Sequence, residues 1–170
     1  YERSLQNVPP LPLNINEVTN LCTIIKNKEH DTKDITFLYN LLKNRIVPGV
    51  DETSKEKAFF LEQIIKNNVK CFINPKEAIR MLGTMQGGYN VNILTSLLDN
   101  KQYQCDAYLQ LKNSILIFDS FYDIEEKYKN GNIYAEQLLY SWSQGEWFQN
   151  KQSLKDKITL NVFNVSGETN

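Results

Sequence analysis

The sequence predicts an all-α fold, and three observations lead to this prediction. Over most of the 170 residues, apolar side chains recur at i, i+3, i+4 and i+7, which places them on one face of an α-helix. Residues that cap helices precede these segments, and glycine, proline or asparagine follows them. The alternation typical of a β-strand is confined to residues 158–165. At this length the helices are expected to form one domain of ordinary size.

The first part of the chain is expected to form short helices that begin at capping residues. Residues 1–13 are predicted to hold the end of a helix and an extended linker, because three prolines lie close together there. Asn16 is the candidate cap of the helix that follows. Asp31 or Asp34 is the candidate cap of the next helix, which is expected to end before Pro48.

The middle of the chain continues this pattern. One helix is predicted to start within residues 51–54, and another at Asn74, where a proline and a glutamate in the first turn reinforce the cap. Residues 81–98 form the longest uncharged run, but in lipid its glycine, threonine and amide residues would leave polar groups without hydrogen bonds. This run therefore predicts two helices joined by a glycine loop, and no membrane contact.

Three further helices are predicted before the strand-like region. The first carries an apolar stripe of Ala107, Leu111, Ile115 and Phe118. The second spans roughly residues 121–130 and ends at Gly131, a residue suited to a left-handed cap. The third starts at Asn132 and carries Ala135, Leu138, Leu139 and Trp142. A final turn is expected to hold Trp147 and Phe148.

Short helices joined by brief polar turns predict a HEAT-like stack of antiparallel helical hairpins over residues 14–157. No strict sequence period accompanies the pattern, and a compact bundle would satisfy it as well. Apolar residues alternate with polar ones within residues 158–170, which predicts a C-terminal β-strand. A lone strand needs a partner, so this segment is expected to be the start of a following domain.

Composition excludes several classes of protein. The 19 basic and 20 acidic residues give a net charge of −1, without the excess of Lys and Arg by which nucleic-acid binders hold phosphates. The 11% aromatic content excludes a disordered chain. Cys22, Cys71 and Cys105 are odd in number and far apart. They argue against a disulfide framework and indicate a reducing, cytoplasmic location.

The residue types that most often carry chemistry give no convincing catalytic or metal site. His30 is the single histidine, and we interpret it as a solvated loop residue before a helix. The three cysteines lack a Cys-x-x-Cys pair and are interpreted as buried hydrophobic residues. Four carboxylates within residues 118–126 are interpreted as the acidic first turn of a helix. Trp142, Trp147 and Phe148 are interpreted as core or docking surface.

Residues 83–90 are the densest glycine stretch. They match neither a P-loop nor a dinucleotide-binding fingerprint, and no predicted strand precedes them. Composition alone favours a tight turn between helices. Because glycine permits close backbone approach, this turn is also our candidate interface or active-site-approach loop, with a buried hinge as the alternative. Its candidate residues are Gly83, Met85, Gln86, Gly87, Gly88, Tyr89 and Asn90.

Several blocks of sequence in a fixed order are more specific than any single motif. The blocks are residues 42–45 with 48–52, 82–90, 118–119 with 121–123, 141–142 with 146–148, and 165–170. Together they resemble the N-terminal domain of the bacterial aconitate hydratase B family, whose members act as aconitases and 2-methylisocitrate dehydratases. The resemblance runs nearly from end to end of the chain.

The resemblance implies a HEAT-like domain that precedes a swivel domain, with the strand at their junction. The family's cluster-ligating cysteines and its substrate-binding residues lie downstream of this region, so none maps onto this sequence. Catalytic, cofactor-binding and metal-binding residues are therefore all expected to be absent here. The 4Fe-4S cluster belongs to the parent enzyme, which interconverts citrate and isocitrate through cis-aconitate.

The resemblance also implies an accessory role for this region. The domain is expected to cover the approach to the active site and to mediate protein contacts, with Met85, Gln86 and Tyr89 facing the catalytic domains of the same chain. Further implied partners are a second copy, through the helical domain, and messenger RNA for the cluster-free parent. A free-standing helical adaptor and an RNA-binding regulatory module are the alternatives. The lone strand argues against the first, and the balanced charge argues against the second.

Overall fold

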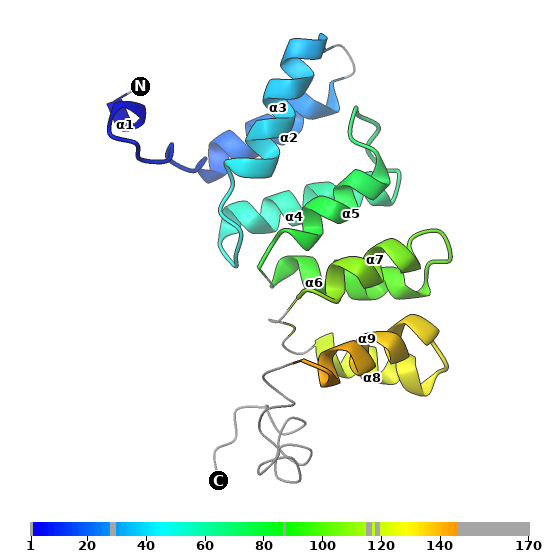
Figure 1. The fold of residues 1–170 in the computed structure, drawn as a ribbon. Coiled ribbons are helices and arrows are strands. Elements are labelled where there is room, and N and C mark those ends of the chain that lie inside the picture. The colour runs from blue at the N-terminus through cyan, green and yellow to red at the C-terminus, as the bar shows by residue number, and fades with distance from the viewer. Residues whose placement is uncertain (1, 28–29, 87, 115–116, 118–119, 146–170) are drawn as a thin grey trace.

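The computed structural model describes residues 2–27, 30–86, 88–114, 117 and 120–145. Within these ranges the chain forms helices and no strand (Figure 1). The all-α prediction is confirmed. The elements are α1 (Glu2–Leu5), α2 (Ile15–Lys26), α3 (Thr32–Asn44), α4 (Glu52–Ile65), α5 (Pro75–Gly83), α6 (Tyr89–Ser96), the 3-10 helix η1 (Leu97–Asp99), α7 (Gln104–Leu111), α8 (Ser120–Lys129) and α9 (Ile133–Ser143).

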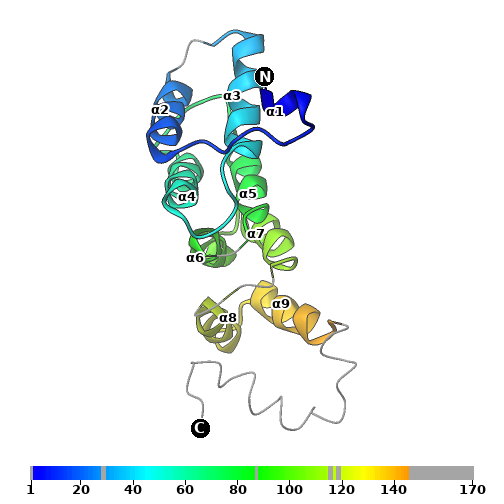
Figure 2. The ribbon, with the colours of Figure 1, turned by 90° about the vertical axis from the view of Figure 1, so that its left-hand side faces the viewer.

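From α2 onward, the helices pair into hairpins that stack on one another. The pairs are α2 with α3, α4 with α5, α6 and η1 with α7, and α8 with α9. Figure 2 shows α2, α4, α6 and α8 in one column and α3, α5, α7 and α9 in the other. Figure 1 shows the turns within hairpins at one edge of the stack and the connections between hairpins at the opposite edge. This arrangement is a stack rather than a compact bundle.

Side-chain caps fix where most of the helices begin. The predicted caps that accept a backbone hydrogen bond at the start of a helix are Asp31, Asp51, Asn74 and Asn132. At α2 the prediction is wrong, because the cap is Asn14 and not Asn16. Asn14 accepts a bond from the Glu17 N–H at 3.0 Å, and its own N–H donates to the Glu17 carboxylate at 2.8 Å. This capping box satisfies two backbone donors that Asn16 could not reach together.

The apolar stripes of the two columns meet in a continuous core. Burial of each leucine or isoleucine contributes roughly 1.5–3 kcal/mol, so this core is the main source of stability. The predicted inward-facing residues that are buried include Val18, Leu21, Cys22, Ile25, Leu38, Leu42, Ala58, Phe60, Leu61, Ile64, Ile65, Ala78, Ile79, Leu82, Leu94, Leu97, Leu98, Ala107, Leu111, Ala135 and Leu138.

Two predicted helices have different bounds in the structure. α7 ends at Leu111 instead of continuing through Phe118, because the backbone N–H groups of Asn113 and Ser114 donate to the carbonyls three residues before them, those of Gln110 and Leu111. The Ser114 hydroxyl also donates to the Gln110 carbonyl, at 3.4 Å, and side-chain bonds of this kind compete with helical hydrogen bonding. α8 spans Ser120–Lys129, close to the predicted range.

The end of α8 is as predicted, because Gly131 has a φ of 83°, the left-handed conformation that ends a helix. The predicted turn with Trp147 and Phe148, the strand over residues 158–165 and the domain boundary after residue 157 lie outside the described residues.

Candidate interface at the glycine loop

The glycine loop joins α5 to α6 at the edge of the stack where hairpins are connected (Figure 1). Gly83 is the last residue of α5, and Thr84 caps it. Gly88 precedes α6 with a φ of 78°, a conformation that residues with a Cβ rarely adopt. The two predicted helices and the loop between them are thus confirmed. Gly87 lies outside the described residues.

The candidate residues of this loop divide into a buried and an exposed group. Gln86 and Tyr89 are exposed, as the prediction of an outward surface requires. Met85 is only 4% exposed and belongs to the core, so it does not face outward as predicted. It belongs to the hydrophobic core, where methionine commonly fills irregular space. The loop therefore presents Gln86 and Tyr89 and hides Met85.

Asn90 holds the loop in place from inside the core. Its side chain is fully buried, and its amide nitrogen donates to the carbonyls of Leu82 at 2.8 Å and Met85 at 3.3 Å. The Leu82 carbonyl belongs to the last turn of α5, where helical partners run out. The side-chain oxygen Oδ1 of Asn90 is buried and has no hydrogen-bond partner among the described residues. Asn90 is therefore a structural residue of the loop and not part of its surface.

The loop packs against the connection between α3 and α4. A Cβ placed on Gly88 would lie 2.7 Å from Cγ1 of Val50. Nearby, the Lys55 ammonium lies 5.9 Å from the centre of the Tyr89 ring, a cation–π arrangement. Contact between the loops thus brings two separate parts of the sequence to one edge. We name their exposed side chains the loop-edge patch: Val47, Val50, Lys55, Gln86 and Tyr89.

Sequence reasoning found the glycine half of this patch and missed the other half. Val50 is 66% exposed and Val47 is 40% exposed, which is unusual for valine. A signal was present, because residues 48–52 form one of the blocks that carry the family resemblance. The pairing of that block with residues 82–90 is a long-range contact that no local pattern reveals.

A Gly88→Ala variant is expected to lose about 1–2 kcal/mol of unfolding free energy, because a Cβ would be strained at this φ and would collide with Val50. Urea denaturation of the chain measures this loss. Gly49→Ala is the matched control, since no neighbouring atom of the described residues lies within 4 Å of a Cβ at that position. It should leave stability unchanged or slightly raised. Equal losses in both variants would contradict this account of Gly88.

His30 makes specific contacts that a solvated loop residue lacks, contrary to our interpretation. Its Nε2 atom lies 2.9 Å from the carbonyl oxygen of Ile24, near the end of α2. Its ring meets the Phe72 ring edge-on, with centroids 5.9 Å apart. The histidine thus ties the first hairpin to the turn before α5. These contacts give His30 a structural role.

The cysteines do not fit an iron–sulfur cluster. Metal ligation needs the thiolate, but burial raises the pKa of the Cys22 thiol to about 12 and also raises the pKa of Cys71. Cys22 on α2 is buried as interpreted, but Cys71 in the turn before α5 is only partly buried, and Cys105 on α7 is exposed, contrary to the interpretation. Among the described residues, no three His, Cys, Asp or Glu side chains are grouped so that they could hold a metal ion.

The carboxylates of residues 118–126 and the aromatic group that includes Trp142 are described only in part. Asp123 lies in the first turn of α8, as interpreted, while Asp119 is outside the described residues. Glu125 forms an ion pair with Lys129 at 2.8 Å. Trp142 packs against the core and is partly buried. Asp123 and Trp142 fit the interpretation of their groups, whereas Glu125 and Glu126 lie beyond the first turn of α8, so the interpretation is wrong for these two carboxylates.

Comparison with known proteins identifies the family. The family model described as "Aconitate B N-terminal domain" matches residues 1–148. This chain belongs to that family. The two sequence blocks that contribute to the loop-edge patch, residues 48–52 and 82–90, lie within this matched range of the aconitate hydratase B family.

Individual relatives agree with the family match. Aconitate hydratase B of Escherichia coli (strain K12) is 44% identical over 170 residues, covering 99% of this chain and 19% of the relative. The Pseudomonas aeruginosa protein of the same name is also 44% identical, with the same coverage. That of Synechocystis is 41% identical over 172 residues, covering 99% of this chain and 20% of the relative. The chain thus spans about a fifth of the length of the curated relatives it matches.

A membrane segment is not found in the part of this family member that the structure describes. None of the helices in the described ranges is both long enough and apolar enough to cross a bilayer. The uncharged run over residues 81–98 is divided between α5, the glycine loop, α6 and η1, as its composition predicted.

Proposed function

We propose that this chain is the N-terminal, HEAT-like accessory domain of a cytoplasmic aconitate hydratase, and that its loop-edge patch docks against the catalytic part of the same polypeptide. The observation that carries the proposal is the family match over residues 1–148, together with relatives in which the matched region is about a fifth of the length. The loop-edge patch supplies a contact surface, because it combines exposed valines, an aromatic ring and one cation.

Catalysis is assigned to the rest of the parent enzyme and not to this domain. By the family resemblance, the parent interconverts citrate and isocitrate through cis-aconitate and acts on 2-methylisocitrate, using a 4Fe-4S cluster. The described residues of this chain offer no fitting ligand set for such a cluster. The role of the domain is then to shape access to a site built elsewhere, and its free thiols suit a reducing compartment.

The test is a pair of substitutions in the complete parent enzyme. A Val50→Asp/Tyr89→Asp variant puts charges into the proposed contact, and we expect kcat/KM for cis-aconitate hydration to fall about tenfold or more, since buried interface anchors carry most of the binding energy. Thermal unfolding of the isolated chain, run in parallel, shows whether the domain itself is still folded.

The control variant is Phe37→Asp, on α3 and outside the patch, where the ring is 63% exposed. It should leave kcat/KM near the unsubstituted value. A patch variant that keeps full activity would overturn the docking proposal, and so would a control that loses as much activity. A patch variant whose oligomeric state changes while its activity does not would assign the patch to contact between copies instead.

A further inference from the structure

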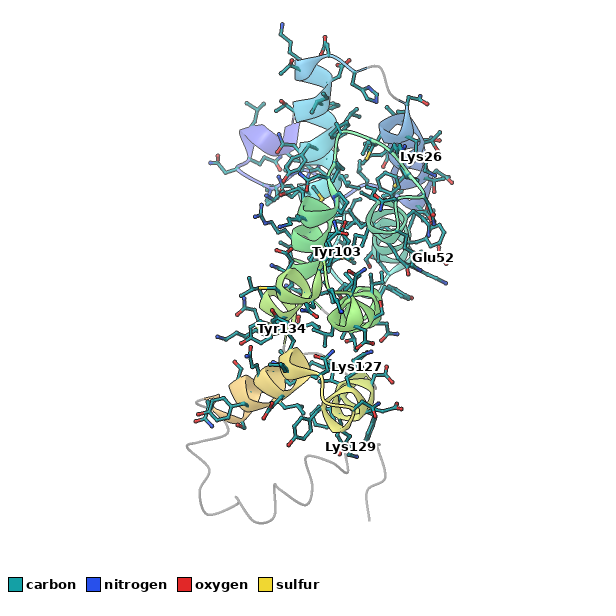
Figure 3. All side chains as sticks on the ribbon, turned by 90° about the vertical axis from the view of Figure 1, so that its right-hand side faces the viewer. Lys26, Glu52, Tyr103, Lys127, Lys129 and Tyr134 are labelled. Atoms are coloured by element: carbon teal, nitrogen blue, oxygen red, sulfur yellow. The ribbon has the colours of Figure 1, made fainter. Side chains whose placement is uncertain are left out.

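A polar groove of about 560 Å³ lies between the third and fourth hairpins, away from the loop-edge patch. Its walls come from α6 and η1 on one side and from α8 and the turn before α9 on the other. Figure 3 shows Lys127 and Tyr134 at this junction, on the edge where the turns within hairpins lie. A volume of this size accommodates a small ligand or a few side chains of a partner.

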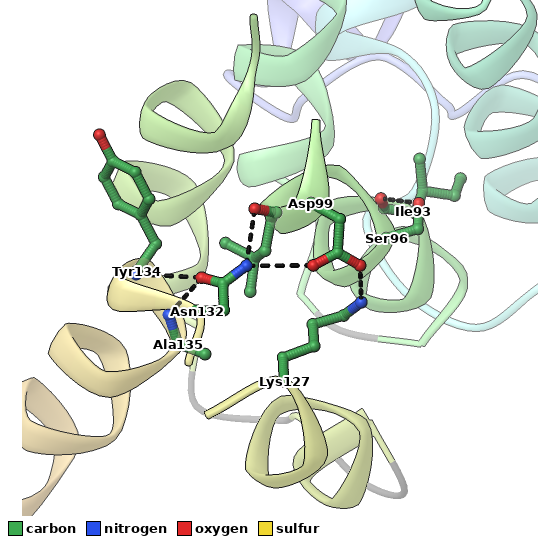
Figure 4. Close-up of polar contacts among 8 residues, drawn as sticks. Ile93, Ser96, Asp99, Lys127, Asn132, Tyr134 and Ala135 are labelled. Atoms are coloured by element: carbon green, nitrogen blue, oxygen red, sulfur yellow. Dashed lines mark hydrogen bonds and ion pairs between the residues drawn. The ribbon is translucent and has the colours of Figure 1, made fainter. Parts of the chain in front are cut away.

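One end of the groove is closed by a network in which every charge is paired. Lys127 forms an ion pair with Asp99, and the Asn132 amide donates to Asp99 at 3.0 Å and to the Leu98 carbonyl at 2.9 Å (Figure 4). The Asn132 carbonyl oxygen caps α9, accepting from the backbone of Tyr134 and Ala135. The polar groups at this end therefore bond one another, and these bonds join the third hairpin to the fourth.

The rest of the groove holds charges that these contacts do not use. Asp123 and Glu126 are exposed, line the groove, and lie three residues apart on α8, so they share one face of that helix. Neither carboxylate is in an ion pair within the described chain. Lys101 is the remaining charged side chain of the lining. Three carboxylates against two ammonium groups leave the lining with one excess negative charge.

Thr95 provides an independent sign that the groove is a site. The residue lines the groove and is 2% exposed, yet its hydroxyl has no hydrogen-bond partner among the described residues. A threonine on a helix commonly donates to the carbonyl four residues before it, as the exposed Thr23 and Thr36 do here. Leaving a buried hydroxyl unpaired costs stability. The Thr95 hydroxyl is thus a hydrogen-bonding group of the groove lining that no described residue satisfies.

We propose that this groove is a binding site for a guanidinium group. A guanidinium is planar, carries five N–H donors, and bonds carboxylates in pairs, which suits Asp123 and Glu126 on one helix face. Its remaining donors can be accepted by the Thr95 hydroxyl. An anion is disfavoured by the excess negative charge, and no described group of three ligands could hold a metal ion. This inference does not depend on the docking proposal, because it concerns a different edge of the stack.

The experiment follows backbone amide signals of the complete ¹⁵N-labelled chain during titration with agmatine, at fixed pH and ionic strength. We expect saturable shifts at Thr95, Asp123 and Glu126, with little change at the loop-edge patch.

A short peptide with one internal arginine, acetylated and amidated, is titrated in parallel. Tighter binding of the peptide assigns the site to a protein partner, and equal or weaker binding assigns it to a small free guanidinium. Butylamine is the third probe, and binding as tight as that of agmatine would contradict guanidinium recognition.

Substitutions separate a binding role from a structural one. Asp123→Asn/Glu126→Gln should weaken agmatine binding about tenfold. Glu52→Gln/Glu56→Gln on α4 removes the same charge and should leave binding unchanged. Thr95→Val should weaken binding without lowering the thermal unfolding temperature, because no bond within the domain is lost. Absence of saturable shifts with both guanidinium probes, or equal weakening in the two double variants, would overturn the proposal.

Discussion

An Asn90→Asp variant is expected to lose about 3–5 kcal/mol of unfolding free energy at pH 7, measured by urea denaturation of the chain. The side chain is fully buried, and its amide donates to the carbonyls of Leu82 and Met85. Substitution replaces this donor by a carboxylate oxygen that faces the same two carbonyl oxygens. The variant thus loses two hydrogen bonds and buries a negative charge against like partial charges.

The loss should depend on pH in a defined direction. Burial without a donor raises the pKa of the introduced carboxyl above its value in the unfolded chain, so the folded state favours the protonated form. Protonation restores one donor and removes the charge. The deficit relative to the unsubstituted chain should therefore shrink as pH falls toward 4, and grow as pH rises through the pKa of the folded variant.

Asn92→Asp is the matched control for this experiment. Asn92 lies on the same helix, is exposed, and accepts a hydrogen bond from the Ser120 hydroxyl, an interaction that a carboxylate keeps. Its effect should stay within about 0.5 kcal/mol. If Asn90→Asp were as mild as the control, the buried amide would not be holding the glycine loop.

Local signals in the sequence were sufficient to predict the helices and the order in which they follow. The caps at Asp31, Asp51, Asn74 and Asn132 act over three residues or fewer, and the apolar stripes act within one helix, so both can be recognised without the fold. The error at α2 has the same local origin. Asn14 and Asn16 are both good caps, and only the partner Glu17 distinguishes them.

The candidate site was harder to predict because its members come together through stacking. Gly88 identifies a special turn, but no local pattern shows that Val50 lies against it. Likewise, an asparagine two residues after a pair of glycines resembles a surface residue, and only the packed hairpins reveal that Asn90 is buried. The groove between the third and fourth hairpins depends on Asp99 and Asn132, which are 33 residues apart. Contacts over such separations follow from the fold and not from the segment.

A second buried polar residue, Lys57, lies between the first two hairpins. Its side chain is 3% exposed, and its ammonium has one weak hydrogen bond, to the Lys43 carbonyl at 3.4 Å near the end of α3. In the described part of the chain no carboxylate forms an ion pair with it. Burial, with a smaller contribution from the charge of Lys43, lowers the pKa of Lys57 from 10.5 to about 8. The folded state therefore disfavours the charged amine, which the unfolded chain tolerates.

Replacing this lysine by an apolar side chain of similar length should consequently stabilise the fold. We expect Lys57→Met to raise the unfolding free energy by about 1–3 kcal/mol at pH 7, because the desolvation cost of the ammonium disappears and only one weak hydrogen bond is lost. Lys33→Met, at an exposed position of α3, is the control and should change stability by less than about 0.5 kcal/mol.

The pH dependence of the difference in unfolding free energy between Lys57→Met and the unsubstituted chain tests whether the buried charge causes it. Between pH 8 and 10.5 the unfolded chain holds the Lys57 proton more tightly than the folded one, so this residue makes the unsubstituted chain more stable as pH rises. A shift from 10.5 to about 8 corresponds to roughly 3 kcal/mol over the full range. Cys22 and Tyr39, whose pKa values are raised to about 12, oppose this trend equally in both proteins, so they cancel in the comparison. The stability advantage of Lys57→Met should therefore change little between pH 7 and pH 8 and narrow as the pH rises from 8 to 10. An advantage that stayed constant over this range would show that packing, and not the buried charge, makes Lys57 costly to the fold.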